Sequence, residues 1–152
     1  MRDIWKVFLG LCSLSSKRSN DTVSVTRCWC HEIQRIFGDR LTDHGDLGWM
    51  RTQIETHVVG DFGMVADEVF ASERLVFASF MTDEIDNRVY EEIADMNQMK
   101  EKIEEYRDNY NEVNTITMPL VMFLDACEHC ARICRVLNQP SGNVLLLGVG
   151  GS

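Results

Sequence analysis

Apolar residues recur at intervals of three and four through the first sixty positions, which is the spacing of one helical face. This spacing predicts a helix over residues 3–14, a second helix that begins at the N-cap residue Asp21 and ends before TDHGD, and a third over about residues 47–58. The apolar positions expected to face a core in the first two helices are Ile4, Val7, Phe8, Leu11, Val25, Cys28, Trp29, Ile33, Ile36 and Phe37. The N-terminal part is therefore predicted to be a small helical bundle.

The middle of the chain combines an extended segment with a charged helix. The stretch RLVFASF, residues 74–80, alternates bulky residues with β-branched Val76 and predicts a short strand. In residues 83–113 the apolar side chains step by three, four or seven positions, so we expect one amphipathic helix there. We interpret its many charges as a solvated helix face rather than an acidic docking surface.

The C-terminal part is predicted to contain a helix, a turn and a strand. The helix spans residues 117–138, with Pro119 in its first turn, where a missing N–H costs nothing. Its expected buried residues are Val121, Phe123, Leu124, Cys127, Ile133 and Leu137, and its expected outward residues are Asp125, Glu128, Arg132 and Arg135. After a turn at residues 140–142, the apolar run Val144–Leu147 is typical of a parallel strand that is covered on both faces. The expected fold class is mainly α with a short β element.

Composition excludes several classes of partner. The 152-residue chain carries 24 acidic and 15 basic residues, a net charge of −9, which repels phosphate backbones and anionic membranes. We therefore expect neither nucleic acid nor a membrane as a partner. No apolar run reaches the roughly 18 residues of a membrane span, so a soluble protein is expected. The opening MRDIWKVFLGLCSL resembles a short signal peptide, but Asp3 and Lys6 interrupt its apolar stretch.

The cysteines do not predict a disulfide framework or a metal site. Three of the six, Cys127, Cys130 and Cys134, fall on one helical stripe, so we expect reduced thiols that pack as small apolar groups. Cys28, Cys30 and His31 are zinc-ligand types, but within one helical turn they cannot converge on a single ion. The run HEIQR lacks the second histidine of a zinc-protease motif, and His129 has no partner at a spacing that suggests catalysis.

The terminal GVGGS has the chemistry of a phosphate-binding loop. Glycines directly after a strand allow backbone N–H groups to wrap a phosphate. The lysine, the magnesium-binding hydroxyl and the following helix of a complete loop are absent from the 152 residues. A flexible glycine tail after a core strand remains the alternative.

Three stretches together resemble the motor ring of a dynein heavy chain, a large AAA+ ATPase that moves on microtubules. MRDIWKVFLG resembles the opening of the helical lid of one AAA+ module, and CWCHEIQRIFGDRL is similar to a later lid helix. MPLVMFLDACEHCARICRVLNQPSGNVLLLGVGGS looks like the entry helix, first strand and incipient P-loop of the next module. Their order and spacing resemble the boundary between the third and fourth modules, and GVGGS is the form associated with axonemal heavy chains of cilia and flagella.

The resemblance implies a division of the chain and a set of site residues. Residues 1–60 would be the helical lid of one module, residues 61–115 a connection with a short strand and an acidic helix, and residues 116–152 the start of the next module. Arg2 lines up with the sensor-two arginine of the lid. Gly148, Gly150, Gly151 and Ser152 match the front half of the P-loop.

We expect a fragment of an axonemal dynein heavy chain, the ATP-driven, minus-end-directed microtubule motor of cilia and flagella. The parent protein would use ATP and magnesium and would bind microtubules and dynein intermediate and light chains in the cytoskeleton of the axoneme. The chain alone is expected to bind neither ATP nor magnesium tightly, to show no ATPase activity and to self-associate. One alternative is a stand-alone acidic helical interaction module without nucleotide binding, and a weaker one is a zinc-bound helical domain.

Overall fold

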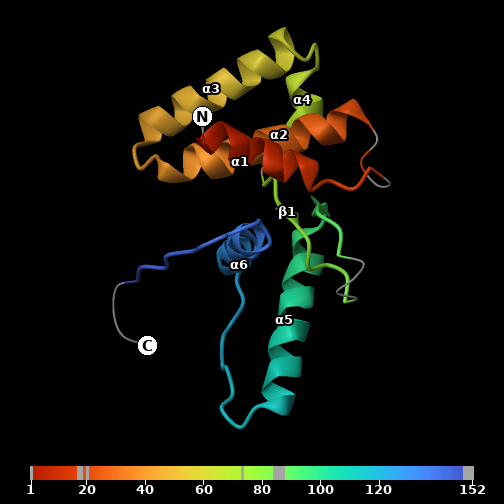
Figure 1. The fold of residues 1–152 in the computed structure, drawn as a ribbon, viewed down its shortest axis with the longest axis vertical. Coiled ribbons are helices and arrows are strands. Elements are labelled where there is room, and N and C mark those ends of the chain that lie inside the picture. The colour runs from red at the N-terminus through yellow and green to blue at the C-terminus, as the bar shows by residue number, and fades with distance from the viewer. Residues whose placement is uncertain (1, 17–18, 20, 73, 84–87, 149–152) are drawn as a thin grey trace.

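A computed structural model describes residues 2–16, 19, 21–72, 74–83 and 88–148. The order of elements is α1 (Arg2–Cys12), α2 (Thr22–Ile36), the 3-10 helix η1 (Gly38–Arg40), α3 (His44–Gly60), α4 (Ala66–Val69), β1 (Phe77–Ala78), β2 (Glu91–Glu92), α5 (Met96–Val113) and α6 (Leu124–Leu137). Helices α1 to α4 form one group, and α5 projects from the opposite side of β1 (Figure 1). The fold is mainly helical with a small β element, as predicted.

The first three helices lie where the apolar spacing predicts them. Asp21 caps α2, since its side chain accepts a hydrogen bond from the backbone N–H of Ser24 at 2.7 Å. Asp43 caps α3 in the same way and starts that helix at His44, a few residues earlier than predicted. Three of the apolar positions expected in the core are exposed instead: Ile4, Phe8 and Val25.

Two separate cores support the two ends of the molecule. The first joins α2, α3 and α4 through Cys30, Met50, Ile54, Val58 and Val69. The second joins β1, α5 and α6 through Val76, Ala78, Phe80, Ile93, Met99, Ile103, Met122, Cys127 and Ala131. A third, smaller cluster of Cys28, Phe77 and Tyr90 lies between α2 and the sheet. The chain thus has a helical N-terminal unit and a mixed C-terminal unit, joined at α2.

The predicted strand near residue 77 is present but short. β1 pairs antiparallel with β2, with Phe77 opposite Glu92 and Ala78 opposite Glu91. Because residues 91–92 pair in this sheet, the predicted helix over 83–113 is wrong in its first half. The backbone N–H of Ile93 donates to Val76 O at 2.9 Å and extends the pairing beyond β2. Asp95 then caps α5, which starts only at Met96.

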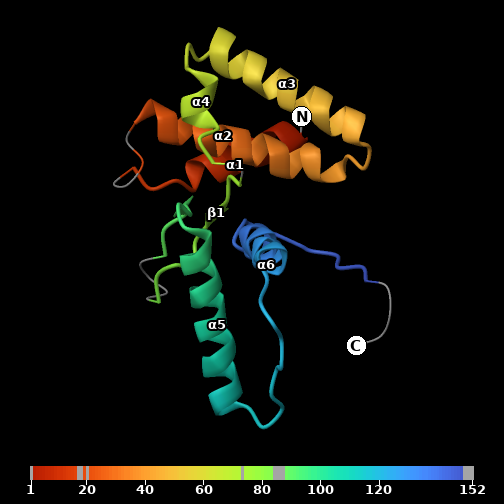
Figure 2. The ribbon, with the colours of Figure 1, turned by 180° about the vertical axis from the view of Figure 1, so that it is seen from behind.

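The predicted start of the last helix is also wrong. Helix α6 begins at Leu124, and residues 117–123 are extended and return alongside α5, as Figures 1 and 2 show. Side chains of α5 hold this segment: Arg107 donates to Leu120 O at 2.8 Å, and Asn111 accepts from the N–H of Met118 at 2.6 Å. These bonds satisfy two backbone groups without a helix: the Leu120 carbonyl, which a helix would pair, and the Met118 N–H, which a first helical turn would leave unpaired. Consequently Val121 and Phe123, predicted to be buried, are exposed, and so is Leu137 at the other end of α6.

The predicted strand over Val144–Leu147 does not form. Residues 142–148 are extended, with Leu145, Leu146 and Leu147 exposed by 82%, 69% and 87%. A strand requires a hydrogen-bonding neighbour, and β1 and β2, the strands in the part of the chain that is described, pair only with each other. No described helix is both long and apolar enough to cross a membrane.

Candidate functional site

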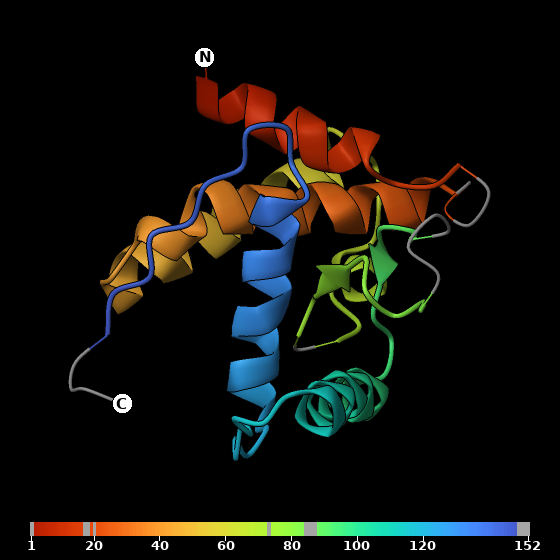
Figure 3. The same ribbon diagram turned by 60° about the horizontal axis from the view of Figure 1, so that its bottom comes forward.

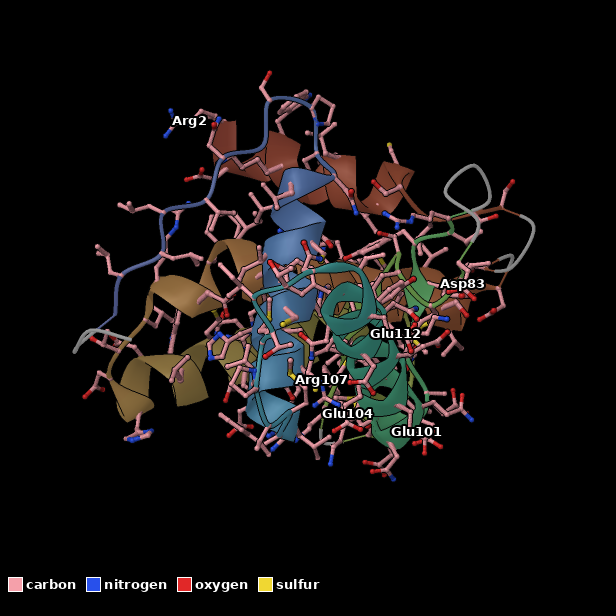
Figure 4. The ribbon with its side chains drawn as sticks, turned by 90° about the horizontal axis from the view of Figure 1, so that it is seen from below. Arg2, Asp83, Glu101, Glu104, Arg107 and Glu112 are labelled. Atoms are coloured by element: carbon pink, nitrogen blue, oxygen red, sulfur yellow. The ribbon has the colours of Figure 1, made fainter. Side chains whose placement is uncertain are left out.

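The residues that the sequence proposes for nucleotide binding lie apart from the cores. Arg2 is the first residue of α1 and its side chain is at the periphery of the molecule (Figure 4). Gly148 is exposed, and a Cβ atom added to it would meet nothing within 4 Å. Gly150, Gly151 and Ser152 lie outside the described residues. The structure therefore places Arg2 and Gly148 on the surface and does not bring them together.

The turn after α6 sets the direction in which the chain leaves toward Gly148. Ser141 has a φ of 57°, and the N–H of Gly142 donates to Gln139 O at 2.9 Å. A Cβ atom on Gly142 would lie 1.8 Å from Val136 O, so only glycine permits this approach to the end of α6. Asn138 adds a bond from its amide to the Ser79 hydroxyl at 2.7 Å, which connects the turn to the residue after β1. The predicted turn is thus present and anchored.

A buried ion pair joins α2 to α6. Glu32 has no exposed surface, and Arg135 is 7% exposed. The Arg135 Nε atom donates to both carboxylate oxygens of Glu32, at 2.9 and 3.1 Å, and its Nη2 donates to Oε2. This fork-to-carboxylate geometry is the strong form of the ion pair. The prediction that Arg135 faces outward is wrong, because its charge is satisfied inside the protein.

Tyr90 completes the polar network around Glu32. Its hydroxyl donates to Glu32 Oε1 at 2.6 Å, and burial together with the neighbouring carboxylate raises the pKa of this phenol well above its usual value. Burial alone would lower the pKa of Arg135, but its bonds to Glu32 outweigh this and the pKa is raised. Both donors therefore keep their protons at any ordinary pH, and the carboxylate remains bonded.

Helix α1 packs directly on the same carboxylate. A Cβ atom on Gly10 would lie 2.0 Å from the carboxyl carbon of Glu32. Any side chain at this position would therefore push α1 away from α2. Figure 3 shows α6 extending from the α1–α2 group toward α5. Glu32 of α2 contacts α1 through Gly10 and α6 through Arg135.

A second polar group of α2, His31, directly precedes Glu32 and also faces α6. The ring of His31 is 3% exposed, and its Nδ1 lies 2.9 Å from Leu75 O, a carbonyl that can only accept. Burial and the nearby guanidinium of Arg35 lower the pKa of His31 to about 3, so the imidazole is neutral. Arg132 of α6 reaches Asp39 at 3.9 Å and Glu128 at 3.5 Å on this side. Because Leu75 O can only accept, the neutral ring donates from Nδ1 and links α2 to the residues before β1.

Arg27 ties the same helix to the sheet. Its Nε donates to Glu92 Oε2 at 2.8 Å, its Nη2 bonds to the other oxygen, and its Nη1 donates to Glu68 O at 3.2 Å and to Val69 O. The guanidinium therefore joins α2 to β2 and to the end of α4.

The cysteines are free thiols, as expected. Cys127 is buried, and Cys130 and Cys134 are half-buried against the second core, which confirms the predicted stripe. Burial raises the pKa of Cys30 to about 12 and that of Cys28 further, so neither thiol is reactive. Among the residues that the structure describes, no cluster of histidine, cysteine and carboxylate side chains could hold a metal ion.

The charges of α5 form a solvated face, as interpreted from the sequence. Glu101 and Glu112 point outward, and Arg107 turns back to the segment that follows α5 (Figure 4). Lys102 binds Glu105 at 2.8 Å and also pairs with Asp83. The acidic side chains thus bond along the helix and with its neighbours.

Sequence reasoning missed the Glu32–Arg135 pair, although a signal was present. Glu32 stands four residues from both Cys28 and Ile36, on the buried face of α2. Arg135 stands four residues after the buried Ala131 of α6. A charge on the apolar stripe of each of two helices indicates a buried partner, because isolated charges are not tolerated there.

Comparison with known proteins identifies relatives over the whole chain. Residues 118–152 match the family described as "P-loop containing dynein motor region D4". The chain is 40% identical over 152 residues to "Dynein axonemal heavy chain 1" of Rattus norvegicus, covering 100% of this chain and 3% of that protein. It is 36% identical over 155 residues to "Dynein-1-beta heavy chain, flagellar inner arm I1 complex" of Chlamydomonas reinhardtii, covering 99% of this chain and 3% of that protein. The 152 residues thus span a small part of the length of these relatives.

Proposed function

Because this chain belongs to the dynein heavy chain family, we propose that its 152 residues serve as part of the motor region of an axonemal dynein heavy chain. The observation that carries the proposal is the match of residues 118–152 to a P-loop motor region, within a similarity that extends over the whole chain. In this function the protein of which the segment is part would use ATP to move on microtubules in the axoneme. Microtubules and dynein intermediate and light chains are its proposed partners.

Within that motor, the glycine run would begin the phosphate site of one module. Gly148, Gly150, Gly151 and Ser152 would contribute backbone N–H groups to the phosphates of ATP, and magnesium would neutralise charge there. Residues 1–60 would be the helical lid of the preceding module, with Arg2 directed at its nucleotide. Residues 61–115 would connect the lid to the next module, which residues 116–152 begin.

The structure offers a reason why residues 144–148 suit this role. The anchored turn at 138–142 directs an extended apolar segment away from the described core. Such a segment is suited to become an inner strand when parallel neighbours are supplied. The charges of α5 largely pair with each other, so α5 does not favour the alternative of an acidic interaction module.

Nucleotide binding tests the proposal. The fluorescence of an ADP analogue with magnesium is titrated with the 152-residue chain and with a dynein heavy chain motor that carries this segment. We expect no tight binding and no ATPase activity from the 152 residues, and binding by the motor that decreases in a Gly151→Asp variant, which would place a carboxylate against the phosphates. Unchanged nucleotide binding in Gly151→Asp would refute a phosphate site at these glycines.

A further inference from the structure

Glu32 contacts two helices, α1 and α6, that lead to the proposed nucleotide-binding residues at the two ends of the chain. Arg135, in the last turn of α6, binds its carboxylate, and Gly10 of α1 packs against the same group. Helix α1 begins with Arg2, and the chain that leaves α6 reaches Gly148 through the anchored turn. One buried carboxylate is therefore in contact with the helix that begins at Arg2 and with the helix that precedes Gly148.

The hydrogen bonds of Glu32 restrain the orientation of α6 as well as its distance from α2. The guanidinium of Arg135 donates to both oxygens of the Glu32 carboxylate, and the Tyr90 hydroxyl donates to Oε1 as well. Two planar groups joined by several hydrogen bonds tolerate little rotation. A pair of apolar side chains of similar size would fill the same space without fixing the rotation of α6 about its axis.

The position of Arg135 makes this restraint relevant to the loop that follows. Three residues after Arg135, Asn138 bonds to Ser79, and Gly142 packs against Val136 O. The end of α6, the turn and the start of the extended segment therefore move together. A rotation of α6 would displace the first residue of the glycine run.

We propose that Glu32, with Arg135 and Tyr90, is a positioning group that couples the Arg2-bearing helix α1 to α6 and thereby aligns the phosphate loop that begins at Gly148. This inference rests on the proposed function, because it assigns a regulatory connection to that same site. A displacement of α1 would be transmitted through the carboxylate to α6.

The test separates alignment from stability with a double methionine variant, Glu32→Met with Arg135→Met, made together with Tyr90→Phe so that no buried hydroxyl loses its acceptor. Apolar replacement of both partners of a buried pair commonly preserves stability, whereas removal of one partner does not. Thermal unfolding of the 152-residue chain checks this first, and a melting temperature within about 5 °C of the parent is the expected result. Arg51→Met with Glu55→Met replaces an exposed pair on α3 and serves as the matched control.

The decisive readout is nucleotide affinity in a dynein heavy chain motor that carries this segment. Binding of the fluorescent ADP analogue that is sensitive to Gly151→Asp defines the site. We expect the double methionine variant to weaken that binding about tenfold, Arg135→Lys to weaken it less because its charge remains, and the α3 control to leave it unchanged. Gly10→Ala, whose methyl group would crowd the Glu32 carboxylate, is expected to weaken binding as well.

The outcomes test the positioning role and the phosphate site separately. Wild-type affinity in a stably folded double methionine variant would overturn the positioning role. If that variant does not fold, wild-type affinity in both Gly10→Ala and Arg135→Lys would overturn it equally. If Gly151→Asp leaves nucleotide binding unchanged, the proposed phosphate site itself fails, and this result is distinguishable because it does not involve Glu32.

Discussion

Glu32, His31, Tyr90 and Arg135 form the joint between α2 and α6. Burial in this joint and in the segment of residues 142–148 is the opposite of what the residue types suggest. The joint buries an ion pair, a tyrosine hydroxyl and a neutral histidine, while the segment exposes three consecutive leucines. The difference is in the partners that each region finds. The charges of Glu32 and Arg135 have matched donors and acceptors, whereas the leucines have no apolar surface against them within the described residues. Burial therefore follows the availability of partners more closely than hydrophobicity.

The largest expected effect on stability comes from removing one partner of the buried ion pair. Arg135→Ala leaves the Glu32 carboxylate without its counter-charge in a site with no exposed surface. Removal of one partner of a buried pair costs about 3–5 kcal/mol, so we expect a loss of this order in the free energy of unfolding. Urea denaturation of the 152-residue chain measures it. A loss below about 1 kcal/mol would mean that the pair is hydrated or absent in solution.

A matched pair of truncations compares a buried apolar residue of the second core with an exposed one of residues 142–148. Met99→Ala removes a side chain with no exposure from the second core and should cost about 2–5 kcal/mol. Leu147→Ala removes a similar volume from the exposed segment and should change stability by less than about 0.5 kcal/mol. Thermal and urea unfolding of both variants test this. Equal losses would show that residues 142–148 pack on the protein in solution.

The pH dependence of stability isolates His31. Its pKa is about 3 in the folded protein and about 6.5 when unfolded, so the unfolded chain binds the extra proton between these values. Stability is complete above pH 6.5 and falls as the pH decreases, by about 1.4 kcal/mol per pH unit. We expect His31→Phe to reduce this slope between pH 6 and 4.5, above the range of most carboxyl groups. An unchanged slope in His31→Phe would contradict a neutral buried imidazole.

The smallest effect is expected at the exposed pair of α3. Arg51 and Glu55 lie 2.9 Å apart with most of the arginine side chain in solvent. An i,i+4 pair of this kind contributes about 0.3–0.5 kcal/mol, so Arg51→Ala should lower the free energy of unfolding by no more than that. Comparison with Arg135→Ala in the same buffer measures how much burial adds to an arginine–carboxylate pair. A similar loss in both variants would contradict the account of the joint.

The sequence predicted helices better than it predicted their limits. The caps Asp21 and Asp43 have local signals, and α2 and α3 form where spacing and capping agree. The starts of α5 and α6 depend on distant partners: Val76 O accepts from Ile93 N–H, and Arg107 holds Leu120. No local pattern contains such bonds, which is why both helices were predicted too long.

The sequence predicted which residues belong to the candidate site but not which side chains pack around the helices that lead to it. The glycine run was predicted from the chemistry of a phosphate-binding loop and Arg2 from the resemblance to a family, and the structural roles of both stay predictions. Glu32 and Arg135 are 103 residues apart in sequence and lie on two different helices. Spacing could have marked each charge as inward-facing, but only the packing of α6 against α2 shows that they meet.

Hydrogen exchange of the backbone amides of residues 144–148 tests the central claim most directly. The claim is that this segment lacks partners among the described residues and, as proposed above, would gain them as a strand in a dynein motor region. We expect exchange near the rate of an unstructured peptide in the 152-residue chain, and strong protection of the same amides in a heavy chain motor that carries this segment. Equally rapid exchange in both proteins would contradict the account, as would strong protection in the 152-residue chain alone.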